Sequence, residues 1–289
     1  MATLIKLLRH NATPRLVVGA LVAYFVYYGA VNHTDTRNKV ASEPGRLVRV
    51  ATAVASQPQR QSDNSARIAR LAKTDHIELL NWALENYRRQ VRDYRGFLYK
   101  QERINGKLKP IEKIAISFME EPFSLLMQWD KSSGVIDKLL YVEGQNDDKM
   151  VVHPTGLLAW IKSVKRDPRS EQARRSSRRT CDQFGFRRTM LSLLEVYRQA
   201  EDQGDLAIGY VGPTQIGGRQ CIALERLLPA KDEYPCGRMV VEFDLEYLLP
   251  TSITSYDWQG NLLSRYVYTE LQFNTGLTGS AFDTKANGL

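Results

Sequence analysis

The stretch from Tyr94 to Trp160 constrains the fold most, because hydrophobic residues alternate along it and turn signals recur at regular intervals. The alternating runs cover residues 94–104, 112–119, 123–129, 138–144 and 149–153. Asn105-Gly106 separates the first two runs, and this dipeptide favours a type I′ hairpin because both central residues need positive φ. The stretch therefore predicts an antiparallel meander in which each strand has one apolar face, so that the sheet covers something on one side only.

Two helical patterns accompany these strands. Asp75 is a candidate N-cap for a helix over 76–92, and residues 189–201 form an amphipathic pattern. A second group of alternating runs lies between Asp205 and Phe273, with no parallel βαβ pattern. The sequence predicts an α+β domain on a large curved antiparallel sheet of roughly ten strands, with the helices covering one face.

An apolar run at 16–31 follows Lys6, Arg9 and Arg15, which would keep its N-terminal side cytoplasmic by the positive-inside rule. The run is shorter than the roughly 20 residues of a comfortable span and longer than a typical signal-peptide core. We expect an uncleaved transmembrane signal anchor; a cleaved signal peptide and a buried core helix are the alternatives.

The expected organisation places the main domain outside the bacterial inner membrane, in the periplasm, with a secreted or periplasmic protein as the alternative after cleavage. Residues 32–65 are rich in Ser, Thr, Asn, Gln and Arg without periodicity, which is typical of a flexible linker. The predicted parts are a basic cytoplasmic region at 1–15, the anchor at 16–31, the linker at 32–65, the α+β domain at 66–283 and a tail at 284–289.

The net charge of +8 is unevenly distributed. Residues 1–73 contain eleven Lys and Arg against three acidic residues, and residues 162–188 contain ten against three. The rest of the chain has more acidic than basic residues, so a basic stripe on a folded face is not expected and nucleic acid is not a predicted partner. The Arg- and Ser-rich segment 169–179 predicts a solvated loop, with contact to lipid head groups or an acidic partner as the sharper alternative.

The sequence contains no recognisable catalytic or metal-binding motif. It has four His residues without metal-ligand spacing, no glycine-rich phosphate loop, no G-x-S-x-G and no H-E-x-x-H. Glu102, Glu143 and Asp257 could be paired carboxylates, but solvated alternate positions on strands explain them better. We therefore expect no enzyme activity, no metal and no cofactor.

Aromatic and aliphatic residues on successive strands are the candidate ligand contacts. If the two helices do not fill the apolar face of the meander, these side chains would line a lipid or acyl-chain cavity; an ordinary filled core is the alternative. The candidates are Phe97, Tyr99, Ile116, Phe118, Leu125, Met127, Trp129, Tyr141 and Trp160. Residues 189–201 could act as a lid over such a cavity.

Three cysteines fit an oxidising compartment without requiring it. Cys221 and Cys236 are candidate disulfide partners, with Cys181 left over, although hairpin register places Cys221 opposite a residue beyond Cys236. The alternative is that the cysteines are small buried residues.

Four segments resemble an uncharacterised family of exported bacterial domains related to the lipoprotein-carrier superfamily that includes LolA and LolB. They are 99–107 (Tyr-Lys-Gln-Glu-Arg-Ile-Asn-Gly-Lys), 121–124 (Glu-Pro-Phe-Ser), 140–146 (Leu-Tyr-Val-Glu-Gly-Gln-Asn) and Asp244-x-Glu246 through Leu249-Pro250. The resemblance covers about residues 75–283 and implies a half-open antiparallel barrel with helices on its concave face. It implies lipid or lipoprotein binding by fold-level analogy and carries no established activity onto particular residues.

Together these patterns predict a non-enzymatic envelope protein that binds a lipid, an acyl chain or a lipoprotein in an apolar cavity. The alternative is a membrane-anchored protein–protein interaction or sensor module with a filled core and an envelope protein as partner. An envelope hydrolase is disfavoured because no catalytic constellation is present.

Overall fold

The computed structural model describes residues 57–130, 136–156, 160 and 162–289. The apolar run at 16–31 and most of the expected linker lie outside these residues. Among the described residues, no helix is both long and apolar enough to cross a membrane.

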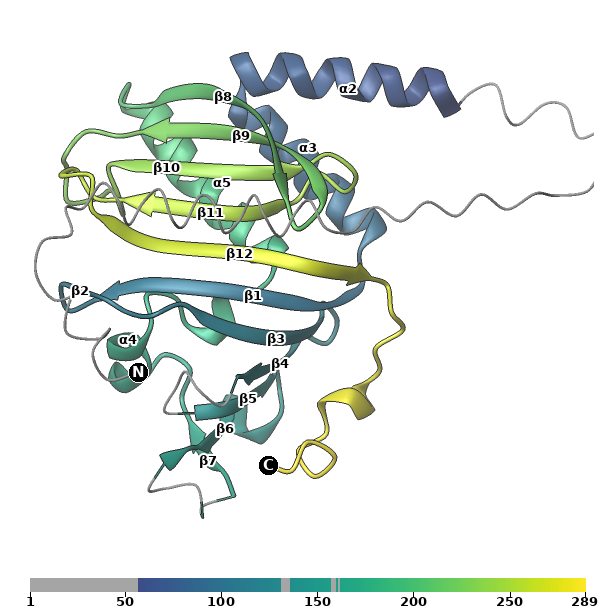
Figure 1. The fold of residues 1–289 in the computed structure, drawn as a ribbon, viewed down its shortest axis with the longest axis vertical. Helices are drawn as coiled ribbons and strands as arrows, with labels where there is room; N and C mark the ends of the chain where they lie inside the picture. Colours follow the sequence, from purple (N-terminus) through teal and green to yellow (C-terminus); the bar gives the residue numbers. More distant parts are fainter. Residues whose placement is uncertain (1–56, 131–135, 157–159, 161) are drawn as a thin grey trace, which may run out of the picture. The chain divides into compact units, whose positions relative to one another are not determined.

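One antiparallel sheet dominates the described part of the chain (Figure 1). Its neighbouring strands follow the order β7-β6-β5-β4-β3-β1-β12-β11-β10-β9-β8, and the short β2 pairs with β1. No described pairing joins β7 to β8, so the sheet is unclosed. The strands are β1 (Asp93–Ile104), β2 (Lys107–Leu108), β3 (Glu112–Met119), β4 (Ser124–Trp129), β5 (Ile136–Val142), β6 (Met150–Pro154), β7 (Val164–Arg166), β8 (Ala207–Ile216), β9 (Arg219–Leu227), β10 (Arg238–Asp244), β11 (Pro250–Tyr256) and β12 (Leu262–Phe273).

Pairing between β1 and β12 joins the two halves of the sheet. It runs antiparallel from Tyr94 opposite Phe273 to Glu102 opposite Ser264. The β1 strand also pairs with β3, so the predicted meander continues directly into the second group of strands. At the predicted hairpin, Asn105 and Gly106 have φ values of 50° and 76°, as a type I′ turn requires. The antiparallel α+β fold is confirmed, with more strands than the ten expected.

Three helices of more than two turns accompany the sheet in the described residues, together with a one-turn helix and short 3₁₀ segments. The α-helices are α2 (Gln57–Thr74), α3 (His76–Gln90), α4 (Glu171–Ser176) and α5 (Phe186–Asp202), and the 3₁₀ segments are η1 (Asn146–Asp148), η3 (Cys181–Gln183) and η4 (Gly279–Phe282). Helices α3 and α5 contact each other and lie behind the sheet in Figure 1, covering one of its faces. The predicted cap of α3 is confirmed, because the Asp75 side chain accepts a hydrogen bond from the Glu78 backbone N–H at 2.8 Å. Helix α2 begins at Gln57, inside the segment expected to be a flexible linker.

Aromatic side chains fill the space between the helices and one end of β1 and β3. We call them the aromatic cluster: Tyr87, Tyr94, Phe118, Phe123, Phe184, Phe186, Tyr268 and Phe273. Gly185 permits this packing, since its φ is 97° and an added Cβ would lie 2.8 Å from the Phe118 ring. The start of α5 therefore approaches the sheet as closely as the backbone allows.

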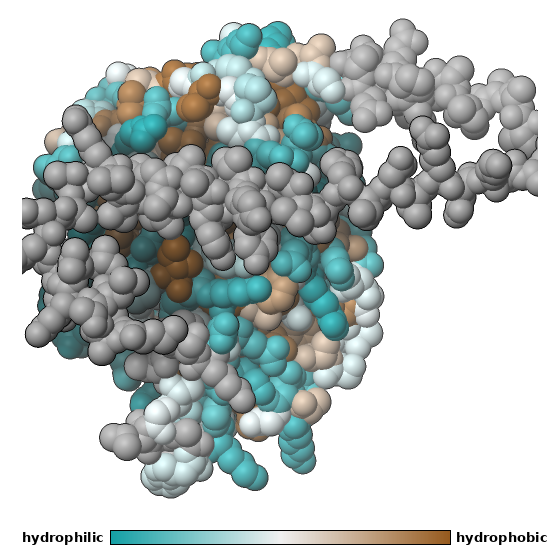
Figure 2. All heavy atoms as spheres, in the orientation of Figure 1, coloured by the Kyte–Doolittle hydropathy of each residue, from teal (hydrophilic) through white to brown (hydrophobic). Residues whose placement is uncertain are grey.

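The C-terminal segment packs on the outer face of the meander. Leu277 and Phe282 join Leu126 and Leu140 in a second buried cluster, against which Leu289 also packs. The β4 strand is consequently buried on both faces, and the prediction that the meander covers something on one side only is wrong there. Its run Ser124–Met127 lacks alternation, which is typical of a strand buried on both sides. Elsewhere the described atoms visible in Figure 2, which views the outer face of the sheet, are mostly hydrophilic.

Candidate functional site

A cavity of about 290 Å³ lies on the covered face of the sheet, beyond the aromatic cluster. Its wall on the sheet side is mainly apolar, and it comes from β1, β3 to β6, β11 and β12. Lys100 and Glu112, which form an ion pair at 2.8 Å, are charged residues of this wall. The apolar residues that β1 and β3 to β6 contribute are Leu98, Ile114, Met127, Trp129, Ile136, Leu139, Met150 and Val152. Mostly apolar walls with a few polar groups are typical of small-molecule sites, whose volumes usually begin near 300 Å³.

The other side of the cavity is formed by the arginine-rich segment 169–183, called the insert below. The insert residues that line the cavity are Ser170, Gln172, Ala173, Ser176, Ser177, Arg179, Thr180 and Cys181. Most of these side chains are short, so the insert covers the apolar wall without filling the space in front of it. The cavity follows from this difference in side-chain size.

Buried Glu102 on β1 holds the insert in place. Its carboxylate accepts hydrogen bonds from the Ser177 hydroxyl at 3.1 and 3.3 Å and from the Arg178 backbone N–H at 3.2 Å. The Tyr266 hydroxyl on β12 donates to it at 2.5 Å, and the Lys100 ammonium lies 3.7 Å away. Burial and the Glu102 carboxylate raise the pKa of Tyr266, so its hydroxyl stays protonated and continues to donate. With 3% of its side chain exposed, Glu102 is not the solvated strand residue that we expected.

Two predictions about the covering segment are wrong. The arginine-rich stretch 169–179 is not a simple solvated loop, because it contains α4 and contacts the sheet through Ser177 and Arg178. The predicted 189–201 lid belongs to α5, whose Met190 and Tyr197 are buried in the core. The segment that covers the cavity is the insert.

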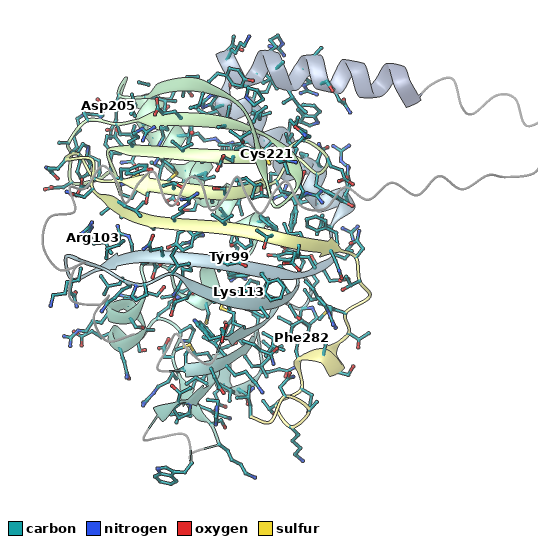
Figure 3. The ribbon with its side chains drawn as sticks, in the orientation of Figure 1. Tyr99, Arg103, Lys113, Asp205, Cys221 and Phe282 are labelled. Carbon is teal, nitrogen blue, oxygen red and sulfur yellow. The ribbon has the colours of Figure 1, made fainter. Side chains whose placement is uncertain are left out.

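Of the nine candidate ligand contacts, only Met127 and Trp129 line the cavity. Ile116, Phe118, Leu125 and Tyr141 lie on the covered face but are packed into the core. Phe97 and Tyr99 lie on the outer face, where the Lys113 ammonium is 4.2 Å and 5.7 Å from their ring centres, as Figure 3 illustrates for Tyr99 and Lys113. Because side chains alternate along a strand, Leu98 rather than its neighbours points inward. Trp160 is 79% exposed.

The sequence argument missed the cavity residues of β5 and β6. Leu139 pairs with Met127 on one side and with Val152 on the other, so these three side chains share a face. The alternation of Leu139 with Tyr141 and of Met150 with Val152 is a usable signal. It identifies the covered face, but it does not show which part of that face the helices leave unfilled.

The candidate disulfide does not form. Both thiols are free in the structure, and they lie near opposite ends of β9. Cys221 contacts Thr251, whereas Cys236 contacts the Arg226 guanidinium, five residues further along the strand. Five residues of strand span about 16 Å, far beyond the distance that a disulfide bridges. Figure 3 shows Cys221 at one end of β9 and Asp205, which contacts the loop before Cys236 through Lys231 and Tyr234, at the other.

The polar groups of the described residues do not form a catalytic constellation. Glu143 pairs with Arg188, and the Asp257 carboxylate accepts hydrogen bonds within its own turn, from the backbone N–H groups of Gln259 and Asn261. Burial raises the pKa of the Cys181 thiol to about 12, so this cavity-lining thiol is not an activated nucleophile. Within the described ranges no cluster of His, Cys, Asp and Glu could hold a metal ion.

The sequence of residues 91–288 matches that of the DUF1571 proteins, described as proteins of unknown function. The chain belongs to the DUF1571 family. This match confirms the expected membership of an uncharacterised family and covers the whole sheet and the insert. No curated protein matches the chain.

Several solved structures are similar to this DUF1571 protein. MucB in the Pseudomonas aeruginosa MucA/MucB complex is 14% identical, with a TM-score of 0.43 over 73% of this chain and 61% of the MucB chain, less than two thirds of its length. The Mycobacterium tuberculosis lipoprotein LppX is 11% identical, with a TM-score of 0.42 over 72% of this chain and 97% of LppX. A LolA superfamily protein from Nitrosomonas europaea is 8% identical, with a TM-score of 0.30 over 70% of this chain and 96% of that protein.

Proposed function

We propose that this DUF1571 protein is a non-enzymatic envelope protein that binds a lipid or the acyl chain of a lipoprotein in the cavity beneath the insert. The observation that carries the proposal is the apolar wall of eight side chains in front of a cover of mostly short ones. Residues 16–31 would anchor the protein in the bacterial inner membrane and place the described domain in the periplasm.

Reversible burial of hydrocarbon would supply the binding energy. Each buried methylene contributes about 0.8 kcal/mol, so a short length of chain against Met127, Leu139 and Val152 gives useful affinity. Ligand entry requires the insert to move. The insert contacts the sheet through hydrogen bonds to Glu102 and through the packing of Ala173 and Cys181 against the core. Water can replace the hydrogen bonds more easily than it can replace a large packed apolar face.

The first test measures whether the purified full chain carries a bound lipid. Organic extraction followed by mass spectrometry is expected to find a lipid or fatty acid bound to the protein. Added fatty acid is expected to bind a delipidated sample and to raise its melting temperature. A protein that carries no lipid and ignores added fatty acids would contradict the proposal and favour the protein–protein interaction module with a filled core.

A cavity-filling variant makes the test specific to this site. Ala173→Trp places a large side chain in the cavity from α4 and is expected to abolish lipid binding while the domain stays folded. Ala207→Trp is the matched control, since Ala207 is exposed at the start of the edge strand β8. Equal lipid binding by the two variants would show that the ligand is elsewhere.

A further inference from the structure

Arg226 is a charged residue on the buried face of β9. Its neighbours on that face, Ile222, Leu224 and Leu228, are buried hydrophobic residues, and Arg226 itself is 1% exposed. Its Nε and Nη1 atoms have no hydrogen-bond partner among the described residues. The Nη2 atom lies 3.6 Å from the Cys236 sulfur, and the guanidinium lies 4.9 Å from the centre of the Tyr197 ring.

Among the residues that the structure describes, no group in contact with this guanidinium supplies a negative charge. Burial raises the pKa of the Cys236 thiol, so it is neutral near pH 7 despite the opposing effect of Arg226. Burial likewise raises the pKa of Tyr197 to about 12. Arginine cannot give up its proton in a protein, and a buried charge without a counter-charge is strongly destabilising. A neutral thiol and one aromatic face compensate for only part of this cost.

Arg226 lines a second cavity, of about 690 Å³, between α5 and strands β9 to β12. Three arginines of the insert, Arg169, Arg178 and Arg179, also line it, as does Arg188 of α5. The Arg179 guanidinium donates to the Thr189 hydroxyl at 3.1 Å and to the Gln183 carbonyl at 3.0 Å, and no carboxylate pairs with it in the described structure.

The acidic side chains around this second cavity pair with only two of its five arginines. Asp182 pairs with Arg169 at 2.7 Å, and Glu143 pairs with Arg188 at 3.3 Å. Glu195 lies on an exposed part of α5. Arg178, Arg179 and Arg226 therefore present positive charge to the cavity without a carboxylate partner among the described residues.

The two cavities are adjacent, because four residues, Arg179, Thr189, Ile253 and Tyr266, line both. A molecule that extends across this junction would meet aliphatic side chains at one end and arginines at the other. We propose that Arg226, together with Arg179, binds the acidic head group of an amphiphile, a carboxylate or a phosphate, whose hydrocarbon chain occupies the apolar cavity. This inference rests on the proposed lipid-binding function and specifies the class of lipid.

The planar guanidinium suits such a head group, since its N–H donors match the two oxygens of a carboxylate or phosphate. Arg103 and Arg174, with Arg169 and Arg178, line a further basic pocket of about 770 Å³ that shares Ser177 and Thr180 with the apolar cavity. Figure 3 shows Arg103 at the end of β1, next to α4. A negatively charged amphiphile approaching past the insert thus meets positive charge before it reaches Arg226.

The test compares three amphiphiles of equal chain length, decanoic acid, decyl phosphate and decan-1-ol, by calorimetric titration into the delipidated full chain. We expect the acids to bind at least about tenfold more tightly than the alcohol, which corresponds to about 1.4 kcal/mol. Whichever of decanoic acid and decyl phosphate binds more tightly identifies the preferred head group as a carboxylate or a phosphate. Titration with inorganic phosphate alone distinguishes a free anion from an amphiphile.

Substitution then assigns the preference to Arg226. Arg226→Met is expected to remove the preference for acids and to leave the affinity for decanol within about twofold of the wild type. Arg238→Met is the matched control, because Arg238 lies on the neighbouring strand but pairs with Glu225 and is exposed. If Arg226→Met fails to fold, the Arg179→Met variant and the comparison of the three ligands on the wild type still test whether these arginines bind an acidic head group.

The outcomes separate the two proposals. Equal affinity of the wild type for acids and alcohol would overturn the head-group assignment and leave lipid binding intact. Binding of none of the three amphiphiles would overturn the proposed function. Arg226-dependent binding of inorganic phosphate in that case would support the anion site without its hydrocarbon chain.

Discussion

The two ends of the covered sheet face are built from the same strands and are covered differently. At one end, Tyr94 of β1 and Phe118 of β3 pack against Phe186 and Phe184 from the start of α5 and the residues before it. At the other end, Leu98 and Ile114 of the same strands face the insert across the cavity. Each turn of a helix can deliver a large side chain to the sheet, whereas Ser, Thr and Ala of the insert leave space.

The two covers also differ in what holds them. Helix α5 is held by buried apolar area, which is lost only when the domain unfolds. The insert is held by hydrogen bonds to Glu102 and by the packing of two small side chains, Ala173 and Cys181, and such limited contacts can open locally. The packed core under α5 keeps the sheet stable, whereas the insert beside it can move to admit a ligand.

The largest expected effect is the loss of an aromatic side chain from the closed end. Phe118→Ala should lower the free energy of unfolding by about 3–5 kcal/mol, because Phe118 is fully buried among Tyr94, Phe123 and Phe184. Urea denaturation followed by tryptophan fluorescence measures the change. The control Phe97→Ala, on the outer face, should cost about 1 kcal/mol or less; equal losses would contradict the assignment of the two faces.

A matched leucine pair tests whether the cavity is unfilled. Leu125→Ala, within the packed core, should cost roughly 4 kcal/mol, and Leu139→Ala, at the cavity wall, roughly 2 kcal/mol, because a side chain beside a cavity loses fewer contacts. The same denaturation experiment on delipidated protein compares them. Equal costs would mean that the space in front of Leu139 is filled.

Glu102→Gln should loosen the insert more than it destabilises the domain. An amide places an N–H₂ group among the donors of Ser177, Arg178 and Tyr266, at a cost of about 1–3 kcal/mol for the contacts that it disrupts. Hydrogen exchange should become faster in residues 171–183 while α5 stays protected. Glu143→Gln, which affects only an exposed ion pair, should leave exchange in the insert unchanged.

The smallest effect concerns pH and His76, the first residue of α3, whose ring lies beside that of Tyr197 on α5. Burial lowers the pKa of His76 below its ordinary value of 6.5, although the hydrogen bond to the Ala72 carbonyl opposes the shift. As pH falls below 6.5 the unfolded chain takes up a proton before the folded one, so the free energy of unfolding should decrease. His76→Gln should flatten this decrease in denaturation curves measured between pH 7 and 5. His153→Gln should retain it, since His76 is intact in that variant.

Local patterns in the sequence predict much of the fold. The alternation of β1 and β3, the Asn105-Gly106 turn and the Asp75 cap each depend on neighbouring residues, and all are present. The antiparallel order of the meander follows from short turns between successive strands. The family resemblance pointed to the same architecture, and the family itself is confirmed.

The site depended on contacts between residues that are distant in the sequence. Phe97 and Leu98 are adjacent and both apolar, and only the register of β1 against β3 and β12 decides which one faces inward. Glu102 accepts a hydrogen bond from Ser177, 75 residues away in the sequence, and the Arg226 guanidinium contacts the Tyr197 ring of α5. No local sequence pattern predicts such long-range contacts.

The sequence by itself therefore determined the strands, the two main helices, the uneven charge and the absence of known catalytic motifs. The tertiary structure alone decided which apolar residues are packed and which line a cavity, and it placed Arg226 in a buried position without a carboxylate. The physical reason is that alternation assigns a side chain to a face, whereas the space in front of that face depends on the size of the side chains that another segment brings to it.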